Sequence, residues 1–226
     1  MVEIERIEPP PRRPQRPAQI LEATCRAILD RGFPATRIAD IAREAGLSTG
    51  AVHYYFQGRD DVLVAALRHA GQQLFDQLDP VVEGDQSELA KLAILLELAT
   101  PYPGARRDSW RLWIELWTHL LHEPHLLPEC EPISARWRSY FFTIIGRGTE
   151  NGEFRPVADP GEVAERLAAL LDGLGFETVV GYSWTSPKHT RDRVLDFAAE
   201  QLRISRSELN RQSLAVPRTE RGRAVA

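Results

Sequence analysis

The chain has 226 residues, which exceeds a typical single domain of about 100–200 residues, so a small domain and a larger one can both be present. Hydrophobic residues make up 43% and charged residues 27%, which excludes collagen-like, mucin-like and wholly disordered chains. The net charge of −4 hides a split, because residues 12–59 hold eight arginines against four acids. A basic segment on an acidic body favours a polyanionic partner, although basic stretches are often only solvated faces.

The sequence carries no signal for a membrane or for export. No apolar run approaches the ~18 residues of a membrane helix, and the N-terminus lacks the basic end and apolar stretch of a secretory signal. Cys25 and Cys130 are the only cysteines, too few for a disulfide framework and without metal-type spacing. We expect a cytoplasmic protein with free thiols, no membrane association and no cofactor.

The first third of the chain predicts an arm followed by four helices. Residues 1–16 are rich in proline and charge, which is typical of a mobile basic arm. Apolar residues recur with a helical period from Pro17 to Arg31, and Gly32 is a stop signal. Two short helices are predicted around Gly46, followed by a longer linking helix. The three ranges are 36–46, 48–56 and about 60–79.

The rest of the chain also predicts helices. Apolar helical patterns separated by prolines recur at about 87–99, 105–122, 132–150, 160–182 and 188–203. No alternating strand pattern bounded by turn signals is present. After Ile204 the composition becomes polar and rich in arginine, so residues 205–226 are predicted to be a disordered tail. The prediction is an all-α fold of about nine helices.

Residues 38–55 fit a helix-turn-helix at its restrictive positions. Ala42 is small where two steeply crossing helices must touch, and Gly46 tolerates the left-handed conformation that the turn needs. Ser48 can cap the second helix, and Thr36 can cap the first one or lie one position away. The pattern favours a DNA-binding helix-turn-helix domain at residues 17–60 over two helices that only pack a core.

The second helix of this motif is the predicted recognition helix, because its N-terminal residues approach base edges. Thr49 can meet a base or a thymine methyl, Gly50 allows close approach, and His53 can donate to a guanine acceptor. Tyr54 is expected to reach a phosphate. The candidates for positioning phosphates without reading sequence are Thr36, Arg37, Ser48 and Arg59.

Residues 17–65 resemble the DNA-binding domain of TetR-family one-component transcriptional regulators. The resemblance rests on Gly32-Phe33, on Thr36 to Ala42 and on Gly46 to Phe56. It implies an all-helical homodimer, usually a repressor, whose C-terminal domain binds a small effector and thereby alters operator binding. Gln57 stands where the family often has a lysine that contacts phosphate, a contact that Arg59 can take over. The next helix opens with Gly58 instead of a polar cap.

The C-terminal part, with its tryptophan-rich stretch and the segment 172–175, is similar to the BetI-like branch of that family. Its aromatic residues recur at helical spacing, which fits either an ordinary core or an effector cavity between helices. An aromatic-lined cavity can hold a flat hydrophobic molecule or a quaternary amine. The predicted effector-pocket residues are Trp110, Trp113, Trp117, Trp137, Phe141 and Phe176.

The last two predicted helices have broad apolar faces, and in the resembling family these helices form the dimer interface. The predicted interface residues are Leu167, Leu170, Leu174, Val194 and Phe197. A twofold axis places two recognition helices in major grooves about 34–36 Å apart or a multiple of this, so the operator is predicted to be an imperfect palindrome.

The competing class is a metal-dependent helical enzyme that uses His119, His122 and His125. Pro124 interrupts this stretch, the spacing is not His-Glu-x-x-His, and no nucleophile elbow or P-loop is present. The sequence therefore favours a ligand-responsive regulator that is not an enzyme. Residues 80–204 are the predicted effector-binding and dimerisation domain.

Overall fold

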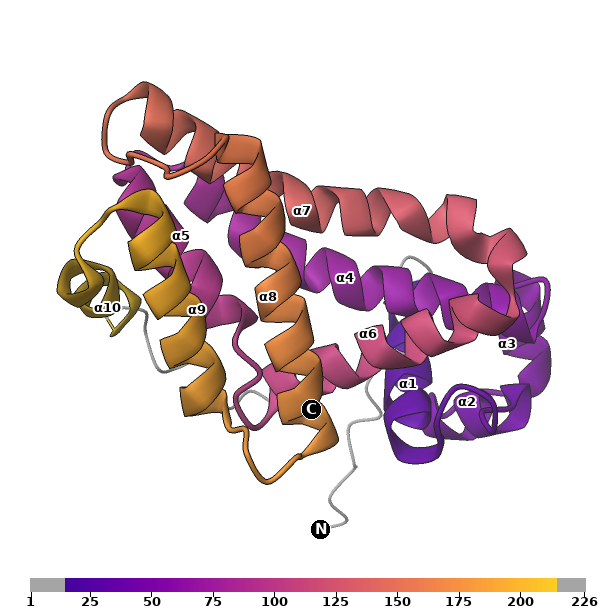
Figure 1. The fold of residues 1–226 in the computed structure, drawn as a ribbon. Coiled ribbons are helices and arrows are strands. Elements are labelled where there is room, and N and C mark those ends of the chain that lie inside the picture. The colour runs from indigo at the N-terminus through magenta and orange to yellow at the C-terminus, as the bar shows by residue number, and fades with distance from the viewer. Residues whose placement is uncertain (1–14, 215–226) are drawn as a thin grey trace, which may run out of the picture. The chain divides into compact units, whose positions relative to one another are not determined.

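The structure is a computed structural model that describes residues 15–214, and it is all-helical over that range (Figure 1). The described residues divide into two compact units, which meet between His69 and Ala70, and this boundary falls inside one long helix. The α-helices are α1 (Gln15–Arg31), α2 (Ile38–Glu44), α3 (Thr49–Tyr55), α4 (Arg59–Glu83), α5 (Glu88–Ala99), α6 (Ala105–His122), α7 (Leu127–Glu150), α8 (Pro160–Val180), α9 (Pro187–Leu202) and α10 (Arg206–Leu214), with a short 3-10 helix at Pro124–Leu126.

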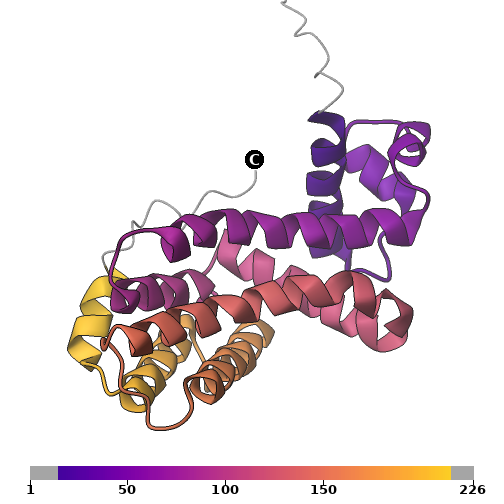
Figure 2. The same cartoon turned by 90° about the horizontal axis from the view of Figure 1, so that it is seen from above.

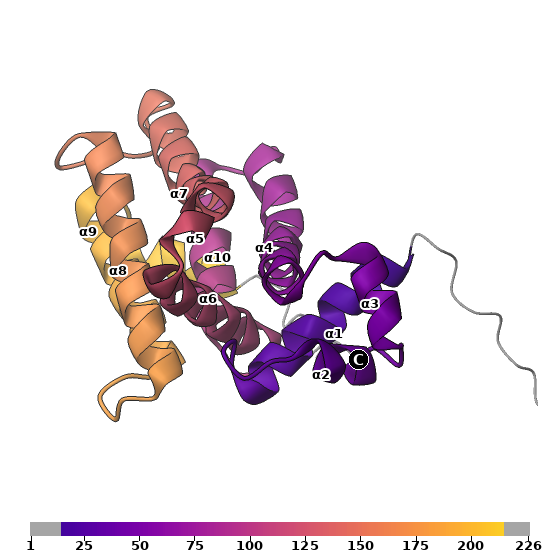
Figure 3. The same cartoon turned by 90° about the vertical axis from the view of Figure 1, so that its right-hand side faces the viewer.

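The first unit is a cluster of α1, α2 and α3 with the start of α4 (Figure 3). Each helix contributes one apolar stripe to a common core, in which Ile20, Ile41, Val52 and Leu63 are fully buried. Burial of such side chains stabilises a small domain by about 1.5–3 kcal/mol each. The three-helix arrangement predicted from the sequence is therefore confirmed.

The turn between α2 and α3 has the backbone geometry that the sequence predicts. Gly46 adopts a φ of +64°, which a residue with a side chain rarely adopts. This conformation lets the Leu47 amide donate to the Ala42 carbonyl at 2.8 Å and closes α2. The Ser48 hydroxyl then accepts from the Ala51 amide at 3.2 Å and caps α3.

The second unit contains the C-terminal part of α4 and the helices from α5 to α10. Its core includes Leu95, Ile144, Leu167 and Leu195, all fully buried. Helices α8 and α9 lie side by side and are joined by a hydrogen bond of 2.6 Å between the hydroxyls of Thr178 and Thr190 (Figure 1). Cys25 and Cys130 are both free thiols, as expected.

Two helices extend past prolines that the sequence suggested as boundaries. Helix α4 continues through Pro80 to Glu83, and α7 begins at Leu127 and contains Pro132. Each proline removes one backbone donor, so each helix loses one i→i−4 hydrogen bond at that position. Arg147, on α7, donates to the Val82 carbonyl at 3.1 Å, which satisfies one acceptor in the last turn of α4.

The predicted tail is wrong for residues 206–214, because these residues form α10. This helix packs against α5 and α9 at one end of the unit (Figure 2, yellow). Leu209 is fully buried, and the buried Arg191 guanidinium donates to Asn210 at 2.8 Å and to Ser213 at 3.1 Å. Residues 215–226 of the predicted tail and residues 1–14 of the predicted arm lie outside the described residues.

Two substitutions on α10 test whether this helix is part of the folded core. Leu209→Ala leaves a cavity and is expected to lower the free energy of unfolding by about 2–4 kcal/mol. Leu214→Ala, on the same helix but 54% exposed, is expected to change it by less than about 0.5 kcal/mol. The measurement is urea unfolding followed by tryptophan fluorescence; equal effects of the two variants would contradict the packing of α10.

Candidate nucleic-acid interface and ligand cavity

Helix α3 presents one buried and one exposed face. The side chain of Val52 is fully buried on one face of the helix, whereas Tyr54 on the other face is 78% exposed. Thr49, Gly50 and His53 are also exposed. These four exposed residues are the ones that the sequence predicts to face DNA, so the structure brings them together on one accessible helix surface.

Gly50 leaves open space at the start of α3. A Cβ placed there would meet only the Ser48 hydroxyl, at 3.8 Å, which is an ordinary van der Waals contact. The fold of the free protein therefore does not require a glycine at this position. A glycine here allows a ligand to approach the backbone closely, as a recognition helix in a groove requires.

Two of the predicted phosphate contacts have structural roles instead. Thr36 is fully buried and its hydroxyl donates to the Gly32 carbonyl at 2.8 Å, so it cannot reach DNA. Thr36 lies one position before the cap of α2, the second of the two predicted places: the cap is Arg37, whose amide donates to the Asp40 carboxylate at 3.2 Å. Arg37 itself is exposed, and so is Ser48, whose cap leaves its own O–H available to donate.

Arg59 is occupied by the first unit's own backbone. Its Nε donates to the Thr36 carbonyl at 2.8 Å, its Nη2 donates to the Phe33 carbonyl, and its Nη1 pairs with Asp60 at 2.7 Å. The guanidinium also lies 5.4 Å from the centre of the Phe33 ring. Arg59 therefore anchors the start of α4 to the loop between α1 and α2, and the prediction that it takes over a phosphate contact is not supported.

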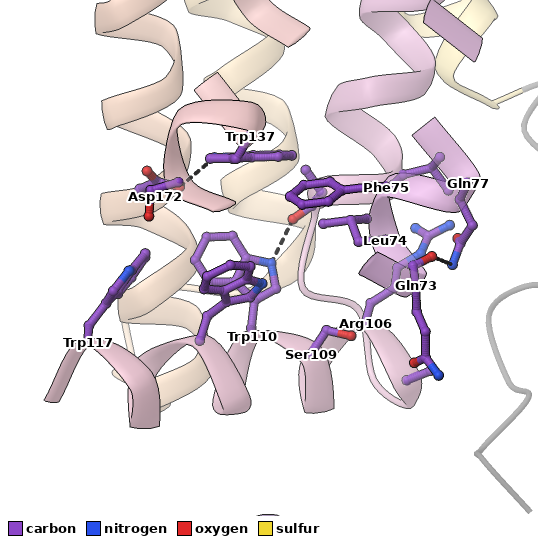
Figure 4. Close-up of a pocket in the computed structure, with 15 residues that line it drawn as sticks. Gln73, Leu74, Phe75, Gln77, Arg106, Ser109, Trp110, Trp117, Trp137 and Asp172 are labelled. Carbon is purple, nitrogen blue, oxygen red and sulfur yellow. Dashed lines mark hydrogen bonds between the residues drawn. The ribbon is translucent and has the colours of Figure 1, made fainter. Parts of the chain in front are cut away.

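The second unit contains a cavity of about 780 Å³, a size typical of sites for drug-sized ligands. Four of the five tryptophans of the chain line it, so the cavity is mostly aromatic. Figure 4 shows Asp172, Trp137 and Trp117 on one side and Gln73 and Gln77 on the other, with the Trp110 ring between. Its walls are Gln73, Leu74, Phe75 and Gln77 of α4, Leu98 and Ala99 of α5, Ala105, Arg106, Ser109, Trp110, Trp113 and Trp117 of α6, Ser134 and Trp137 of α7, and Asp172 of α8.

The position of the Trp110 ring is fixed from two sides. Its indole N–H donates to the Ala99 carbonyl at 2.8 Å, and the ring lies directly against Gly175. A Cβ on Gly175 would come within 2.4 Å of the ring, so only glycine at this position allows Trp110 to pack against α8. Gly175 therefore permits a close approach, and its partner is the Trp110 ring.

Two aromatic residues of the predicted effector pocket do not line the cavity. Phe141 is fully buried in the core, where its ring packs edge-on against Trp137 with centroids 5.1 Å apart. Phe176 is 40% exposed on the outer face of α8. Trp110, Trp113, Trp117 and Trp137 are the predicted residues that the cavity does bring together.

Asp172 is a cavity residue that the sequence prediction missed. Its carboxylate accepts from the Trp137 indole N–H at 3.3 Å. Burial raises the pKa of the Asp172 carboxyl to about 6, although the Trp137 hydrogen bond and the charge of Arg138 act in the opposite direction. The available signal was a lone acid between Leu171 and Leu174 in an otherwise apolar helical segment. A partly desolvated carboxylate in a cavity is a candidate functional group.

The predicted dimer residues divide into two groups. Leu167 and Val194 are buried in the core of their own chain, so they cannot form an interface with another copy. Leu170, Leu174 and Phe197 are partly buried against the same core. In the C-terminal half of α8, the exposed residues recur at intervals of four, three and four: Ala169, Gly173, Phe176 and Val180.

The histidine cluster behind the enzyme hypothesis is not assembled as a metal site. His122 and His125 are exposed, and His125 lies 3.4 Å from Glu123. Within residues 15–214, no group of three or more His, Cys, Asp or Glu side chains is arranged to hold a metal ion. The metal-dependent enzyme is therefore not supported.

An exposed recognition helix on one unit and an aromatic cavity in the other define a ligand-responsive, DNA-binding transcriptional regulator. The sequence profile of the tetR family of bacterial regulatory proteins matches residues 20–66, and that of the C-terminal domain of BetI-type transcriptional repressors matches residues 88–203. The chain belongs to the TetR family, with a BetI-type C-terminal domain. None of the helices between residues 15 and 214 has the length and hydropathy of a membrane span.

Individual relatives agree with this assignment. The chain is 27% identical over 198 residues to the regulator BetI 1 of Chromohalobacter salexigens, covering 86% of this chain and 94% of that protein. It is 30% identical over 168 residues to the regulator PksA of Bacillus subtilis, covering 74% and 80%. A transcriptional regulator from Saccharomonospora viridis in complex with choline has a similar structure, with a TM-score of 0.77, 33% identity, and coverage of 84% and 98%.

The raised pKa of Asp172 predicts a stabilising substitution. The Asp172 carboxyl has a folded-state pKa of about 6, against an ordinary value of 3.8. Its contribution to the free energy of unfolding is therefore most favourable below about pH 3.8 and is lost as the pH rises through about 6. Asp172→Asn keeps an acceptor for Trp137 and does not ionise. We expect it to raise the free energy of unfolding by about 2–3 kcal/mol at pH 7.5, and by about half as much at pH 5.

Urea unfolding at the two pH values, followed by tryptophan fluorescence, measures this difference. The control is Asp76→Asn, which removes the same charge from an exposed site on α4 and is expected to leave stability unchanged. A destabilised Asp172→Asn protein at pH 7.5 would show that the carboxylate is compensated within the fold.

Proposed function

We propose that this regulator is a homodimeric repressor that binds a palindromic operator and is released when a small molecule enters the cavity of the second unit. Residues 17–60 are the DNA-binding domain, and residues 80–204, extended by α10, bind the effector and dimerise. The observation that carries the proposal is the exposed face of α3, where a glycine without a structural role lies between Thr49 and His53.

In the proposed complex, the exposed residues of α3 divide by chemistry. Thr49 and His53 carry groups that can hydrogen-bond to base edges in the major groove, and Gly50 lets the backbone approach them. Tyr54, Arg37 and Ser48 donate to phosphates and set the position of the helix without reading sequence. The buried side chain of Val52 attaches α3 to the core of the first unit and so holds these groups in a fixed arrangement, which supports sequence recognition.

The cavity is the proposed effector site. Its volume and its tryptophan lining suit a small organic molecule, and the Saccharomonospora viridis regulator with a similar fold is in complex with choline. Helix α4 is the proposed route of communication, since Phe75 and Gln77 line the cavity and Arg59, in the same helix, is bonded to the loop that precedes α2. An effector that favours one position of α4 over another then changes operator affinity, by a coupling of about 1–3 kcal/mol.

The proposed dimer contact is the outward face of α8. Ala169 and Gly173 are small enough for close helix approach, and Phe176 and Val180 are apolar side chains that a second copy can cover. A Cβ on Gly173 would meet nothing within 4 Å, so the space in front of it is open to a partner. We further propose that the protein acts without catalysis and in the cytoplasm, where bacterial DNA is found.

The recognition helix is tested by the double variant Thr49→Ala/His53→Ala. Each lost base contact is worth about 1–3 kcal/mol, so affinity for DNA from the protein's own promoter region is expected to fall at least tenfold at fixed salt. The matched control is Thr118→Ala/His122→Ala, the same pair at the same spacing on an exposed face of α6. Fluorescence anisotropy with labelled DNA measures both; unchanged binding by the first variant contradicts the assignment.

The dimer contact is tested by Val180→Asp. A carboxylate buried without a partner opposes association, so we expect the dimer to dissociate at least about tenfold more readily. Val157→Asp is the control, because Val157 is 47% exposed and Val180 is 49% exposed, but Val157 lies between α7 and α8. Sedimentation velocity over a range of protein concentrations separates the two; a Val180→Asp protein as dimeric as the control rules out this face.

A further inference from the structure

The cavity offers a single charge without an ion-pair partner. Asp172 accepts one hydrogen bond, from Trp137, and forms no ion pair within residues 15–214. The closest arginine along α7, Arg138, is paired with Glu165 at 2.8 Å. A partly buried carboxylate without a cation lowers the stability of the folded protein, because it has lost part of its hydration. A bound cation would compensate for this loss.

The other polar groups of the cavity do not compete for this role. Arg106 is a cation and cannot attract another one; it lies 3.5 Å from the Glu97 carboxylate, which also pairs with Arg191, and it donates to the Glu97 carbonyl at 2.7 Å. The remaining polar side chains are uncharged amides and hydroxyls: Gln73, Gln77, Ser109 and Ser134. The lining therefore holds one carboxylate, at the Asp172 side, and one guanidinium, Arg106, on the side of Gln73 and Gln77 (Figure 4).

The aromatic lining also favours a positively charged ligand. Trp137 donates to Asp172 and also presents its ring to the cavity, and three further tryptophans project from one face of α6. The faces of indole rings attract cations, with an energy that grows when water is excluded. They also stack against flat apolar groups. An anion or a strongly hydrated neutral molecule gains neither interaction.

The size of the cavity points to a ligand much larger than choline. A cavity of about 150 Å³ is enough for benzene, and choline has a similar size. The cavity of this protein measures about 780 Å³, so choline would leave most of the tryptophan surface without contacts. A ligand that fills it has several rings or an equivalent apolar body.

We propose that the cavity selects a large, flat organic cation whose positive charge faces Asp172 and whose body lies against the tryptophan rings. This rests on the proposed function of the cavity as the effector site and specifies the class of effector. The charge sets the orientation, since the opposite side of the cavity holds the Arg106 guanidinium, which repels a cation, beside the amides of Gln73 and Gln77.

Two planar dyes with the same fused-ring skeleton test the charge requirement. Nile blue is a cation at pH 7.5, and Nile red is its neutral counterpart of nearly the same size; choline is the third ligand, for size. Binding to the full-length protein is measured by quenching of tryptophan fluorescence, which reports on the cavity because four of the five tryptophans line it. We expect Nile blue to bind at least about tenfold more tightly than Nile red or choline.

The variant Asp172→Asn identifies the residue responsible. It is expected to lower Nile blue affinity at least about tenfold and to change Nile red affinity less than about twofold, since only the cation interacts with the charge. Asp76→Asn, which removes an exposed charge from α4 next to the lining residues Phe75 and Gln77, is expected to leave both affinities unchanged. Urea unfolding shows that each variant is folded.

The outcomes separate this proposal from the proposed function. Equal binding of the two dyes, or equal effects of Asp172→Asn on both, overturns the charge requirement while leaving the cavity as an effector site. Tighter binding of choline than of Nile blue overturns the size requirement, and absence of binding by either dye overturns the ligand class. Failure of the proposed function appears elsewhere, as absence of operator binding by the ligand-free protein.

Discussion

The buried carboxylate of Glu97 is the interaction on which the second unit depends. It accepts from Arg191 of α9 at 2.9 Å and from Ser213 of α10 at 3.1 Å, and it lies 3.5 Å from Arg106 of α6. A charge this deep is stable only when it is paired and fully hydrogen-bonded, so each of these helices must keep its place for α5 to keep its own. The same network fixes Arg106, a wall of the cavity, and explains why a helix as polar as α10 stays folded.

Asp172, in the same unit, differs from Glu97 because its carboxylate has no ion-pair partner among the described residues. Glu97 and Asp172 are both carboxylates removed from most of the solvent, but only Glu97 is compensated by arginines of its own chain. The uncompensated charge costs stability, which the well-packed core of α5, α7 and α8 can tolerate. A group that opposes folding and faces a cavity is understandable if a ligand supplies the missing partner, because binding sites commonly trade stability for function.

The sequence predicts what is set locally and fails where distant residues decide. Helix spacing, the glycine turn at Gly46 and the cap at Ser48 depend on a few neighbouring residues, and these predictions are confirmed. Arg59 has the right chemistry for a phosphate, but backbone carbonyls more than twenty residues away occupy it. Trp137 and Phe141 share one side of a helix, yet only the first reaches the cavity, because the packing of α7 against its neighbours decides which ring is enclosed.

The arginines of the first unit differ in their availability to DNA, although all contribute to its positive charge. Arg43 pairs with Asp40 at 2.6 Å and holds the pKa of that carboxyl below its ordinary value, but its side chain is 64% exposed. Exposed ion pairs contribute little to stability, so such an arginine can exchange its carboxylate for a phosphate at small cost. Arg59 cannot, because leaving its carbonyl partners would release α4. Arg37 and Arg43 are therefore more accessible to a phosphate than Arg59 is.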